Sequence, residues 1–313
     1  MPTAAIPPDE PDCGHRGGPH GHGIALTLAR AGHDVLVQDP IEAARASLGA
    51  RITDSLTGLG VADPAPIVAR VQAAETIAEA VAEADVIFEA APEKLPLKKA
   101  LFSEVEVHAP REAILASNTS VIPITKIMDH LAYKDRALGT HWWNPPHMIP
   151  LVEVIRTEWT QDAAMDQMMA LLGAAGKTPV RVEKDVPGFI GNRLQHALWR
   201  EAVSLVENGI CSAEAVDDVV KASFGRRLAV LGPLENADLV GIELTQDIHD
   251  QVLFDLEATP KPSPHLQTLL DQGRSGMAAG AGFRDWAPGE IDQVKARVAA
   301  HLRKLEGILP DES

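Results

Sequence analysis

Cysteine, aromatic side chains and long apolar runs are all scarce in this chain of 313 residues. Only Cys13 and Cys211 are present, so no disulfide framework holds the fold together, and we expect a protein of the reducing cytoplasm. No apolar run approaches the roughly 18 residues of a membrane span, and residues 1–20 contain no apolar stretch of signal-peptide length. The sequence therefore predicts neither a membrane partner nor secretion.

Basic residues are scarce as well. Lys and Arg number 28 against 44 Asp and Glu, which gives a formal net charge of −16 at pH 7. Such a surplus of negative charge repels nucleic-acid phosphates and anionic lipids, so we expect no nucleic-acid partner. Because aromatic residues make up only 4% of the chain, the core must consist mostly of aliphatic side chains. The length allows one large domain or two ordinary ones.

The first part of the chain, residues 1–184, alternates short apolar runs with helical patterns. The runs predict strands at 34–39, 85–89, 113–116, 136–141, 151–155 and 178–182. The helical patterns between them cover about 23–31, 41–60, 74–84, 94–108, 123–131 and 162–174. Since this alternation builds parallel sheets through right-handed crossovers, the pattern predicts a doubly wound α/β sheet.

The pattern changes near residue 184, and residues 185–313 contain helical periodicity without a convincing strand. The expected helices cover about 189–208, 213–224, 233–257 and 287–306. The stretch 258–285 is rich in Pro and Gly, which indicates a surface excursion. We therefore expect a second, all-helical domain after the α/β domain.

A glycine-rich turn precedes the first clear helix. Gly18, Gly21 and Gly23 stand before it or at its start, and Asp39 ends the next strand. In dinucleotide-binding folds such glycines let the backbone approach a pyrophosphate, and the acid binds the adenosine ribose, which favours NAD over NADP. The alternative is a loop whose glycines merely turn the chain. We expect an NAD site that includes all four residues.

Two features depart from this dinucleotide pattern. Residues 9–15 contain no apolar run where a first strand should enter the turn, and Arg16 occupies the position expected for the first glycine. Four prolines in the first eleven positions predict a disordered N-terminus. A side chain at Arg16 cannot follow glycine through a tight turn at positive φ.

A frame shift would account for both departures. With suitable synonymous codons, residues 12–20 read one base later encode Ile-Ala-Val-Ile-Gly-Ala-Gly-Pro-Met, a hydrophobic strand that runs into Gly-x-Gly. We therefore hypothesise that residues 1–20 are a frame-shifted translation, with the frame restored near Gly21. The third bases of the gene's own codons decide this: polar residues in the shifted frame would contradict it.

The same stretch offers an alternative reading as a metal site. Cys13, His15, His20 and His22 are residue types that bind zinc, and the last two are close enough in sequence to share an ion. The stretch is bounded by prolines and lacks a regular ligand spacing. We expect no metal, and the zinc reading stays open as the less favoured one.

A His–Glu pair is the main candidate for acid–base chemistry. His141 stands at the end of one predicted strand, and Glu153 stands within the next apolar strand. An acid in such a strand is costly unless it is paired, and a carboxylate on one ring nitrogen fixes the tautomer of a general base. The alternative is a purely structural pair. His147, further along the connecting loop, reads as a loop residue.

Two further segments are candidates for ligand contact. Ser117-Asn-Thr-Ser120 follows a strand and opens a helix, so its hydroxyls either cap that helix or reach a ligand. Pro187-Gly-Phe-Ile-Gly-Asn192-Arg193 opens the first helix of the second domain. Its alternative interpretation is an ordinary helix start.

Together these segments resemble the L-3-hydroxyacyl-CoA dehydrogenase family over about residues 21–286. The matching motifs are Ser-Asn-Thr-Ser at 117–120, His-x-x-Asn-Pro at 141–145, Leu-Val-Glu-Val at 151–154, Pro-Gly-Phe-Ile-x-Asn-Arg at 187–193 and Gly-Phe-Arg-Asp-Trp at 282–286. In the last motif Arg284 stands where the family has Tyr. The resemblance implies a Rossmann-type domain followed by a helical domain through which the protein forms a homodimer.

The resemblance also implies catalytic roles. His141 would be the general base on the substrate hydroxyl and Glu153 its orienting partner. Ser120 and Asn192 would bind the reacting oxygen and nearby groups. The expected reaction is the NAD-dependent oxidation of a 3-hydroxyacyl-CoA, or the reverse reduction, as in fatty-acid metabolism.

Three more residues match the part of the family that binds the cofactor. Glu93 and Lys98 belong to a segment that lines the nicotinamide side, and Asn118 belongs to the Ser-Asn-Thr-Ser motif. We expect all three at the NAD site.

The substrate is less constrained than the chemistry. Coenzyme A carries several phosphates, yet residues 41–62 offer only Arg45 and Arg51 to bind them. The segment from Trp142 to Leu151 also resembles relatives that act on small free acids, namely a dehydrogenase of pyridoxine breakdown, L-gulonate 3-dehydrogenase and L-carnitine dehydrogenase. We rank acyl-CoA first and a small hydroxy acid or aldehyde second. A non-catalytic homologue of the lambda-crystallin kind is the third reading, because Arg16 interrupts the glycine turn.

Overall fold

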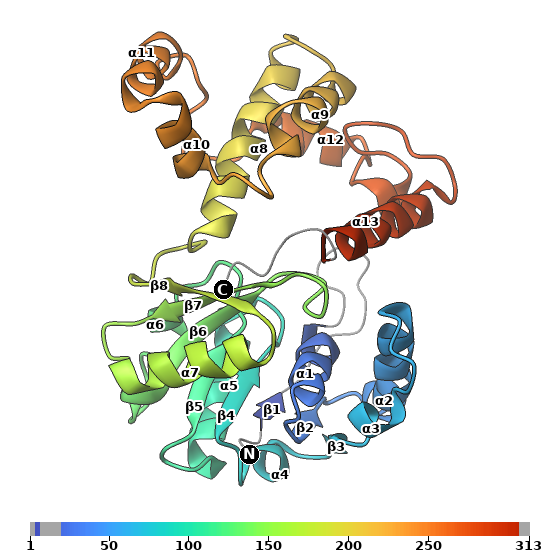
Figure 1. Cartoon of the computed structure of the whole chain (residues 1–313), viewed down its shortest axis with the longest axis vertical. Coiled ribbons are helices and arrows are strands. Elements are labelled where there is room, and N and C mark those ends of the chain that lie inside the picture. The colour runs from blue at the N-terminus through green and yellow to red at the C-terminus, as the bar shows by residue number, and fades with distance from the viewer. Residues whose placement is uncertain (1–3, 7–19, 307–313) are drawn as a thin grey trace. The chain divides into compact units, whose positions relative to one another are not determined.

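The computed structural model describes residues 4–6 and 20–306 (Figure 1). The chain divides into two compact units, Met1–Arg193 and Leu194–Ser313. The first is an α/β unit and the second is helical, which confirms the predicted fold class of a Rossmann-type sheet followed by a helical domain. The change of sequence pattern at residue 184, as a domain boundary, stays a prediction.

The first unit contains one eight-stranded sheet in the order β3-β2-β1-β4-β5-β6-β7-β8. Its strands are β1 (Ala4–Ile6), β2 (Val35–Gln38), β3 (Val71–Ala74), β4 (Val86–Glu89), β5 (Ile114–Ser117), β6 (Ala137–Trp142), β7 (Leu151–Arg156) and β8 (Thr178–Val182). All neighbouring strands are parallel except β6 and β7. The strand β3 was absent from the sequence prediction.

The strand β1 lies in the middle of the sheet and pairs with both β2 and β4. The prediction of a disordered N-terminus is therefore wrong for residues 4–6. Backbone pairing to a strand on each side holds this short segment, whereas the sequence pattern led us to look for a strand at residues 9–15, directly before the turn. The frame-shift hypothesis was argued from residues 12–20, and all of these except His20 lie outside the described residues, Arg16 and Gly18 included, so it stays a prediction.

The strands β6 and β7 are antiparallel, which corrects the expectation that every connection is a crossover. Residues 143–150 join them, and this link is too short for the dozen or more residues that a parallel connection needs. The register places His141 directly opposite Glu153. Opposite residues in an antiparallel pair lie on the same face, so the hairpin brings these two side chains together.

Helices cover both faces of the sheet. They are α1 (His20–Arg30), α2 (Glu42–Gly58), α3 (Ala65–Val68), α4 (Ile77–Val81), α5 (Leu95–His108), α6 (Ile124–Met128) and α7 (Asp162–Ala174). One apolar cluster joins α1, α2 and α7 to Phe88 of β4, and a second joins α4, α5 and α6 to the adjacent Ile87. Successive strand residues point to opposite faces, so this division is the doubly wound arrangement that the sequence predicts.

The second unit contains α8 (Gly191–Glu207, which begins in the first unit), α9 (Ala213–Ala222), α10 (Pro233–Val240), α11 (Ile242–Val252), α12 (Pro264–Asp271) and α13 (Glu290–Glu306) (Figure 1). The single helix expected at 233–257 is two helices, because Gly241 takes φ = +100° between them. The expected surface excursion at 258–285 includes α12. Within residues 4–6 and 20–306, no helix is long and apolar enough to cross a membrane.

Gly139→Ala tests the packing of β6 against α6. An ideal Cβ at this position would lie 2.6 Å from Cδ1 of Ile124 and 3.1 Å from Cβ of Ile155. We expect this overpacking to cost about 1–3 kcal/mol and to lower the Tm in thermal unfolding followed by circular dichroism. The control is Gly173→Ala on α7, where nothing lies within 4 Å and Ala favours the helix. Equal Tm values for the two variants would contradict the packing.

Candidate active site

The candidate acid–base pair is formed across the β6–β7 hairpin. Nδ1 of His141 lies 2.7 Å from Oε2 of Glu153, and both side chains are buried. Because an ionised carboxylate only accepts hydrogen bonds, Nδ1 carries the proton and donates it to Glu153. Nε2 is thereby left as the acceptor nitrogen, and it has no hydrogen-bond partner among residues 4–6 and 20–306.

The second oxygen of Glu153 is held by the chain at the start of α8. Oε1 accepts hydrogen bonds from the backbone N–H groups of Ile190 and Gly191, at 2.8 and 3.0 Å. Burial acts to raise the pKa of the Glu153 carboxyl, but the hydrogen bonds from His141, Gly191 and Ile190 outweigh it and hold the pKa below the ordinary value of 4.5. Glu153 is therefore a charged group with a donor on each oxygen.

Aromatic rings surround His141. The centre of the Trp143 ring lies 5.3 Å from the centre of the imidazole, and the centre of the Phe189 ring lies 5.7 Å from it. Phe189 takes φ = +50°, directly after Gly188 at φ = +75°, so the chain makes a left-handed turn at this point. An ideal Cβ at Gly191 would collide with the indole of Trp143, so only glycine lets the helix start this close to the ring.

Ser120 and Asn192 are adjacent in the structure. Nδ2 of Asn192 donates to the backbone carbonyl of Ser120 at 2.8 Å. The hydroxyl of Ser120 has no hydrogen-bond partner within the part of the chain that the structure describes. The two polar side chains that sequence analysis selected for the reacting oxygen therefore come together through the backbone of one of them.

Glu93 holds the loop that carries Ser120. Its Oε1 accepts from the Thr119 hydroxyl at 2.5 Å and from the backbone N–H groups of Ser120, Val121 and Ile122 at 3.0–3.3 Å. Burial acts to raise the pKa of Glu93, yet the Thr119 hydrogen bond and the other donors outweigh it and lower the pKa. In this structure Glu93 organises the loop between β5 and α6.

Lys98 is fully buried and binds carboxylates. Its Nζ lies 2.8 Å from Oε1 of Glu89 and 3.6 Å from Oε2 of Glu93, and it also donates to the carbonyl of Ala91 at 2.8 Å. The second oxygen of Glu89 accepts from the Ser117 hydroxyl at 2.6 Å. The sequence prediction gave Glu89 no role, although an acid that ends a buried apolar strand is the same kind of signal that indicated Glu153.

Asn118 connects β5 to β6. Its side-chain Oδ1 accepts a hydrogen bond from the backbone N–H of Trp142 at 2.9 Å. The backbone N–H of Asn118 donates to the backbone carbonyl of Glu89 at 2.7 Å. The side-chain oxygen of Asn118 is thus used within the protein. The amide nitrogen Nδ2 makes no hydrogen bond to any residue in the described ranges.

The loop between β6 and β7 packs on α1. An ideal Cβ at Gly23 would lie 3.1 Å from Cδ of Pro146 and 3.3 Å from Nδ1 of His147. Burial lowers the pKa of His147, and the charges of Lys177 and Arg30 act in the same direction, so its ring favours the neutral form. A side chain at Gly23 would press against this loop, because the loop and the helix approach closely.

Three of the residues expected at the NAD site lie in the first turn of α1 and directly after β2. Gly21 and Gly23 lie in the first turn of α1, which contains no acidic residue, so no carboxylate of that turn opposes an anion at the positive end of the helix. Asp39 is buried directly after β2 and accepts a hydrogen bond from the N–H of Ile41 at 2.8 Å. Gly18 and Arg16 lie outside the described residues.

Two family models match the chain. One, described as 3-hydroxyacyl-CoA dehydrogenase, NAD binding domain, matches residues 16–186, and the other, described as 3-hydroxyacyl-CoA dehydrogenase, C-terminal domain, matches residues 188–286. The chain belongs to the 3-hydroxyacyl-CoA dehydrogenase family. It is an oxidoreductase with NAD as its cofactor, as the sequence predicts.

Individual relatives act on different substrates. The chain is 36% identical over 295 residues to the 5-formyl-3-hydroxy-2-methylpyridine 4-carboxylate 5-dehydrogenase of Mesorhizobium japonicum, covering 93% of this chain and 94% of the relative. It is 38% identical over 226 residues to the L-carnitine dehydrogenase of Streptomyces griseus, covering 71% and 67%. A solved 5-formyl-3-hydroxy-2-methylpyridine 4-carboxylic acid 5-dehydrogenase, described as an NAD⁺-dependent dismutase, superposes with a TM-score of 0.89 at 32% identity over the whole of both chains.

The structure tests only part of the zinc hypothesis. Across residues 4–6 and 20–306, no group of three or more His, Cys, Asp or Glu side chains could hold a metal ion. His22 lies on α1, where Nε2 is 3.3 Å from the hydroxyl oxygen of Ser55. Cys13 and His15 are outside the described residues, so a zinc cluster that includes them stays untested.

Glu153→Gln tests the buried carboxylate through the pH dependence of stability. A lowered pKa contributes stability that is present above the ordinary value of 4.5 and is lost as the pH falls through the folded-state pKa. We therefore expect the variant to have a lower Tm than wild type at pH 7, and the difference to shrink below about pH 4.5. The control is the exposed Glu112→Gln, which should follow wild type. A Tm difference that does not change between pH 7 and pH 3.5 would contradict the assignment.

Proposed function

We propose that this member of the family oxidises the hydroxyl group of a small free hydroxy acid, or reduces the matching carbonyl, with His141 as the general acid–base. The observation that supports this most directly is the pair of His141 and Glu153, with Nδ1 committed to the carboxylate and Nε2 without a protein partner. A buried imidazole in that state is ready to accept a proton from a substrate.

In the proposed reaction, bound NAD supplies the acceptor for the hydride that leaves the carbinol carbon. Nε2 of His141 takes the hydroxyl proton, so that the ring becomes an imidazolium. Glu153 keeps the ring in one orientation and stabilises its positive charge, since the carboxylate lies 2.7 Å from Nδ1. In the reverse direction the same nitrogen returns the proton to the carbonyl oxygen.

Ser120 and Asn192 are proposed to bind the reacting oxygen. The Ser120 hydroxyl is uncommitted within the described chain, and Asn192 uses one of its two amide N–H groups on the Ser120 carbonyl. Two donors held in this way would stabilise negative charge that develops on the oxygen during hydride transfer.

The NAD site is proposed to comprise two groups of residues. Gly18, Gly21, Gly23 and Asp39 would bind the adenosine and pyrophosphate part. Glu93, Lys98 and Asn118 would lie along the nicotinamide side. Lys98 and Glu93 support this role indirectly, because their bonds fix the backbone of the loops that follow β4 and β5.

Arg45 and Arg51, the two residues available for coenzyme A phosphates, support a small substrate. Arg45 donates to the carbonyl of Asp39 at 2.6 Å, and Arg51 donates to the carbonyl of Ala44 at 3.3 Å. Both guanidinium groups are thus turned toward the chain's own backbone. The relatives that act on a pyridine carboxylate and on L-carnitine agree with a substrate that carries a free carboxylate.

An acyl-CoA is the second candidate substrate. It is favoured by the family models, both of which describe 3-hydroxyacyl-CoA dehydrogenase domains. The proposed chemistry at His141 is the same for both substrates, so the choice depends on groups that bind the rest of the molecule.

A second copy of this chain is the proposed partner. Among residues 194–306 no apolar side chain is buried, whereas large ones such as Leu234 and Phe254 are exposed by 81% and 82%. An apolar surface of this kind is costly in water and is typical of a permanent interface. We propose that α10, α11 and the turn after them pack against a second copy.

A substrate panel tests the proposed function. After NADH binding has been established by nicotinamide fluorescence, kcat/KM is measured for L-carnitine and 5-formyl-3-hydroxy-2-methylpyridine 4-carboxylate with NAD⁺, and for acetoacetyl-CoA with NADH. We expect a free acid to exceed acetoacetyl-CoA by about tenfold or more, a difference of about 1.4 kcal/mol in transition-state binding. Arg45→Ala should leave the KM for that acid unchanged. A preference for acetoacetyl-CoA, with a KM that rises in Arg45→Ala, would select the second candidate.

Light scattering after size exclusion tests the dimer. Wild type should have twice the chain mass of 33.4 kDa. The double variant Leu234→Asp and Phe254→Asp should shift toward the monomer, because charges at the centre of an apolar interface are strongly unfavourable. The control is Val107→Asp on α5, which is 76% exposed and lies in the first unit. A wild-type monomer at micromolar concentration would contradict the proposal.

A further inference from the structure

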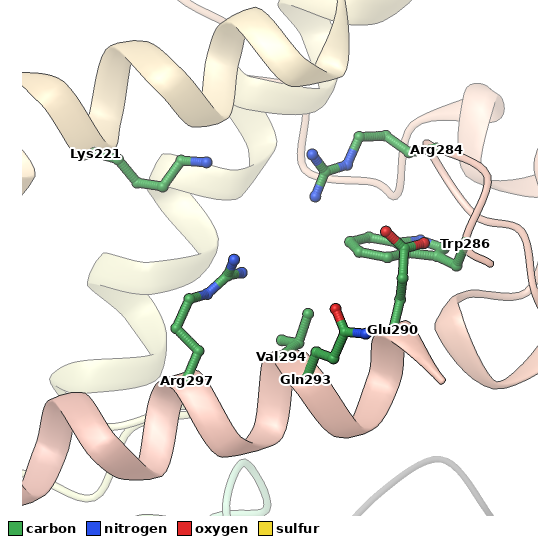
Figure 2. A pocket seen from close by; sticks show the side chains of 7 residues that line it. All are labelled: Lys221, Arg284, Trp286, Glu290, Gln293, Val294 and Arg297. Atoms are coloured by element: carbon green, nitrogen blue, oxygen red, sulfur yellow. The ribbon is translucent and has the colours of Figure 1, made fainter. Parts of the chain in front are cut away.

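A pocket in the helical unit gathers positive charge in a strongly acidic protein. It has a volume of about 200 Å³, and its lining includes Lys221, Arg284, Arg297, Trp286 and Glu290. Lys221 lies on α9, Arg297 lies on α13, and the other three lie in the chain that leads into α13 or at its first residue. Figure 2 shows the charged ends of Lys221, Arg284 and Arg297 pointing from three segments toward the same space.

Arg297 is the cation of this pocket without an acidic partner. It makes no hydrogen bond or ion pair to any residue in the described ranges. Lys221 contacts Asp218 at 3.2 Å on its own helix, but both side chains are largely exposed, and such a pair contributes little. An anionic ligand could therefore contact both Arg297 and Lys221 without breaking a strong ion pair.

Arg284 is the third cation, and its orientation is fixed. Its guanidinium lies 4.5 Å from the centre of the Trp286 ring and 3.4 Å from the carboxylate of Asp217. Stacking on an aromatic ring keeps the guanidinium plane in place and leaves its N–H edge for a ligand. Arg284 is also the residue that stands where the family motif has Tyr.

The charges and the size of the pocket favour a small dianion. The three basic residues and the single acidic residue of the lining sum to a formal charge of +2, from +3 and −1, while Asp217 and Asp218, which contact Arg284 and Lys221, lie outside the lining. The volume is below the roughly 300–1,000 Å³ of pockets that enclose whole drug-sized ligands. Phosphoryl groups satisfy both conditions, and arginine and lysine are the side chains that bind them.

We propose that this pocket binds a phosphoryl group, with Arg297 and Lys221 as the main contacts and Arg284 as the third. The site lies wholly within the second unit and shares no residue with the proposed dinucleotide or catalytic residues. It also shares no residue with the apolar surface around Leu234 and Phe254. Free phosphate and the phosphoryl group of a larger ligand have the same chemistry here.

Isothermal titration calorimetry of the full chain with inorganic phosphate tests the site. We expect saturable binding that weakens about tenfold in Arg297→Gln, since a charge-assisted contact is lost. The control is Lys295→Gln, an exposed residue two positions earlier on α13 that is not in the lining. It should bind phosphate as wild type does, and circular dichroism should be the same for all three proteins.

Phosphate that binds equally well to wild type and Arg297→Gln would overturn the proposal, as would the absence of saturable heat up to about 10 mM phosphate. A parallel titration with phenyl phosphate distinguishes the two sources of the group. Tighter binding of phenyl phosphate, lost in Trp286→Leu, would identify a phosphoryl group on a larger, ring-bearing ligand. Equal binding of both anions would identify free phosphate. These titrations are independent of turnover, so they do not depend on the proposed dehydrogenase substrate.

Discussion

The buried carboxylate of Glu153 is the interaction on which the candidate site depends. One oxygen binds His141, and the other binds the backbone at the start of α8. An ionised carboxylate in an apolar strand would be unstable without such donors, so the hairpin and the helix start stabilise the charge together. In return the charge fixes the imidazole in one tautomer. The same contact therefore serves both the fold and the proposed chemistry.

Two more carboxylates, one at the end of β4 and one in the loop that follows it, have a similar role. Glu89 binds Lys98 and Ser117, and Glu93 binds the amides of the loop that carries Ser120. Each acid uses its donors to hold a loop, although Glu89 is fully buried and Glu93 is exposed. The polar end of the sheet is thus organised by negative charges, and protonation of Glu93 or Glu153 would loosen the loops as well as the catalytic pair.

Much of this could be predicted from the sequence, because the signals were local. The apolar strands and the glycine-terminated helices have clear periodicity, and an acid inside the strand 151–155 indicated a partner such as His141. The antiparallel turn between β6 and β7 was missed because strand periodicity does not reveal direction, although the short link 143–150 could have done so. The central strand β1 was missed because its stability comes from pairing on both sides and not from its own composition.

The role of Glu89 was not predicted, for a different reason. Its partner Lys98 is nine positions away on the next helix. Sequence patterns assign both Lys and Glu to the surface, so they do not predict a buried Lys–Glu pair. Likewise, the pocket around Arg297 joins α9 to α13 across more than seventy positions of the chain. Contacts of this kind follow from the tertiary structure alone.

Proton transfer by His141 can be tested by single-turnover oxidation of NADH, followed by absorbance. Wild type is compared with His141→Ala and with the exposed control His108→Ala. The substrate is the best carbonyl compound found for wild type. We expect the hydride step to slow by a factor of about 10²–10⁴ in His141→Ala, with NADH affinity unchanged and the control equal to wild type. A hydride step of wild-type rate in His141→Ala would contradict it.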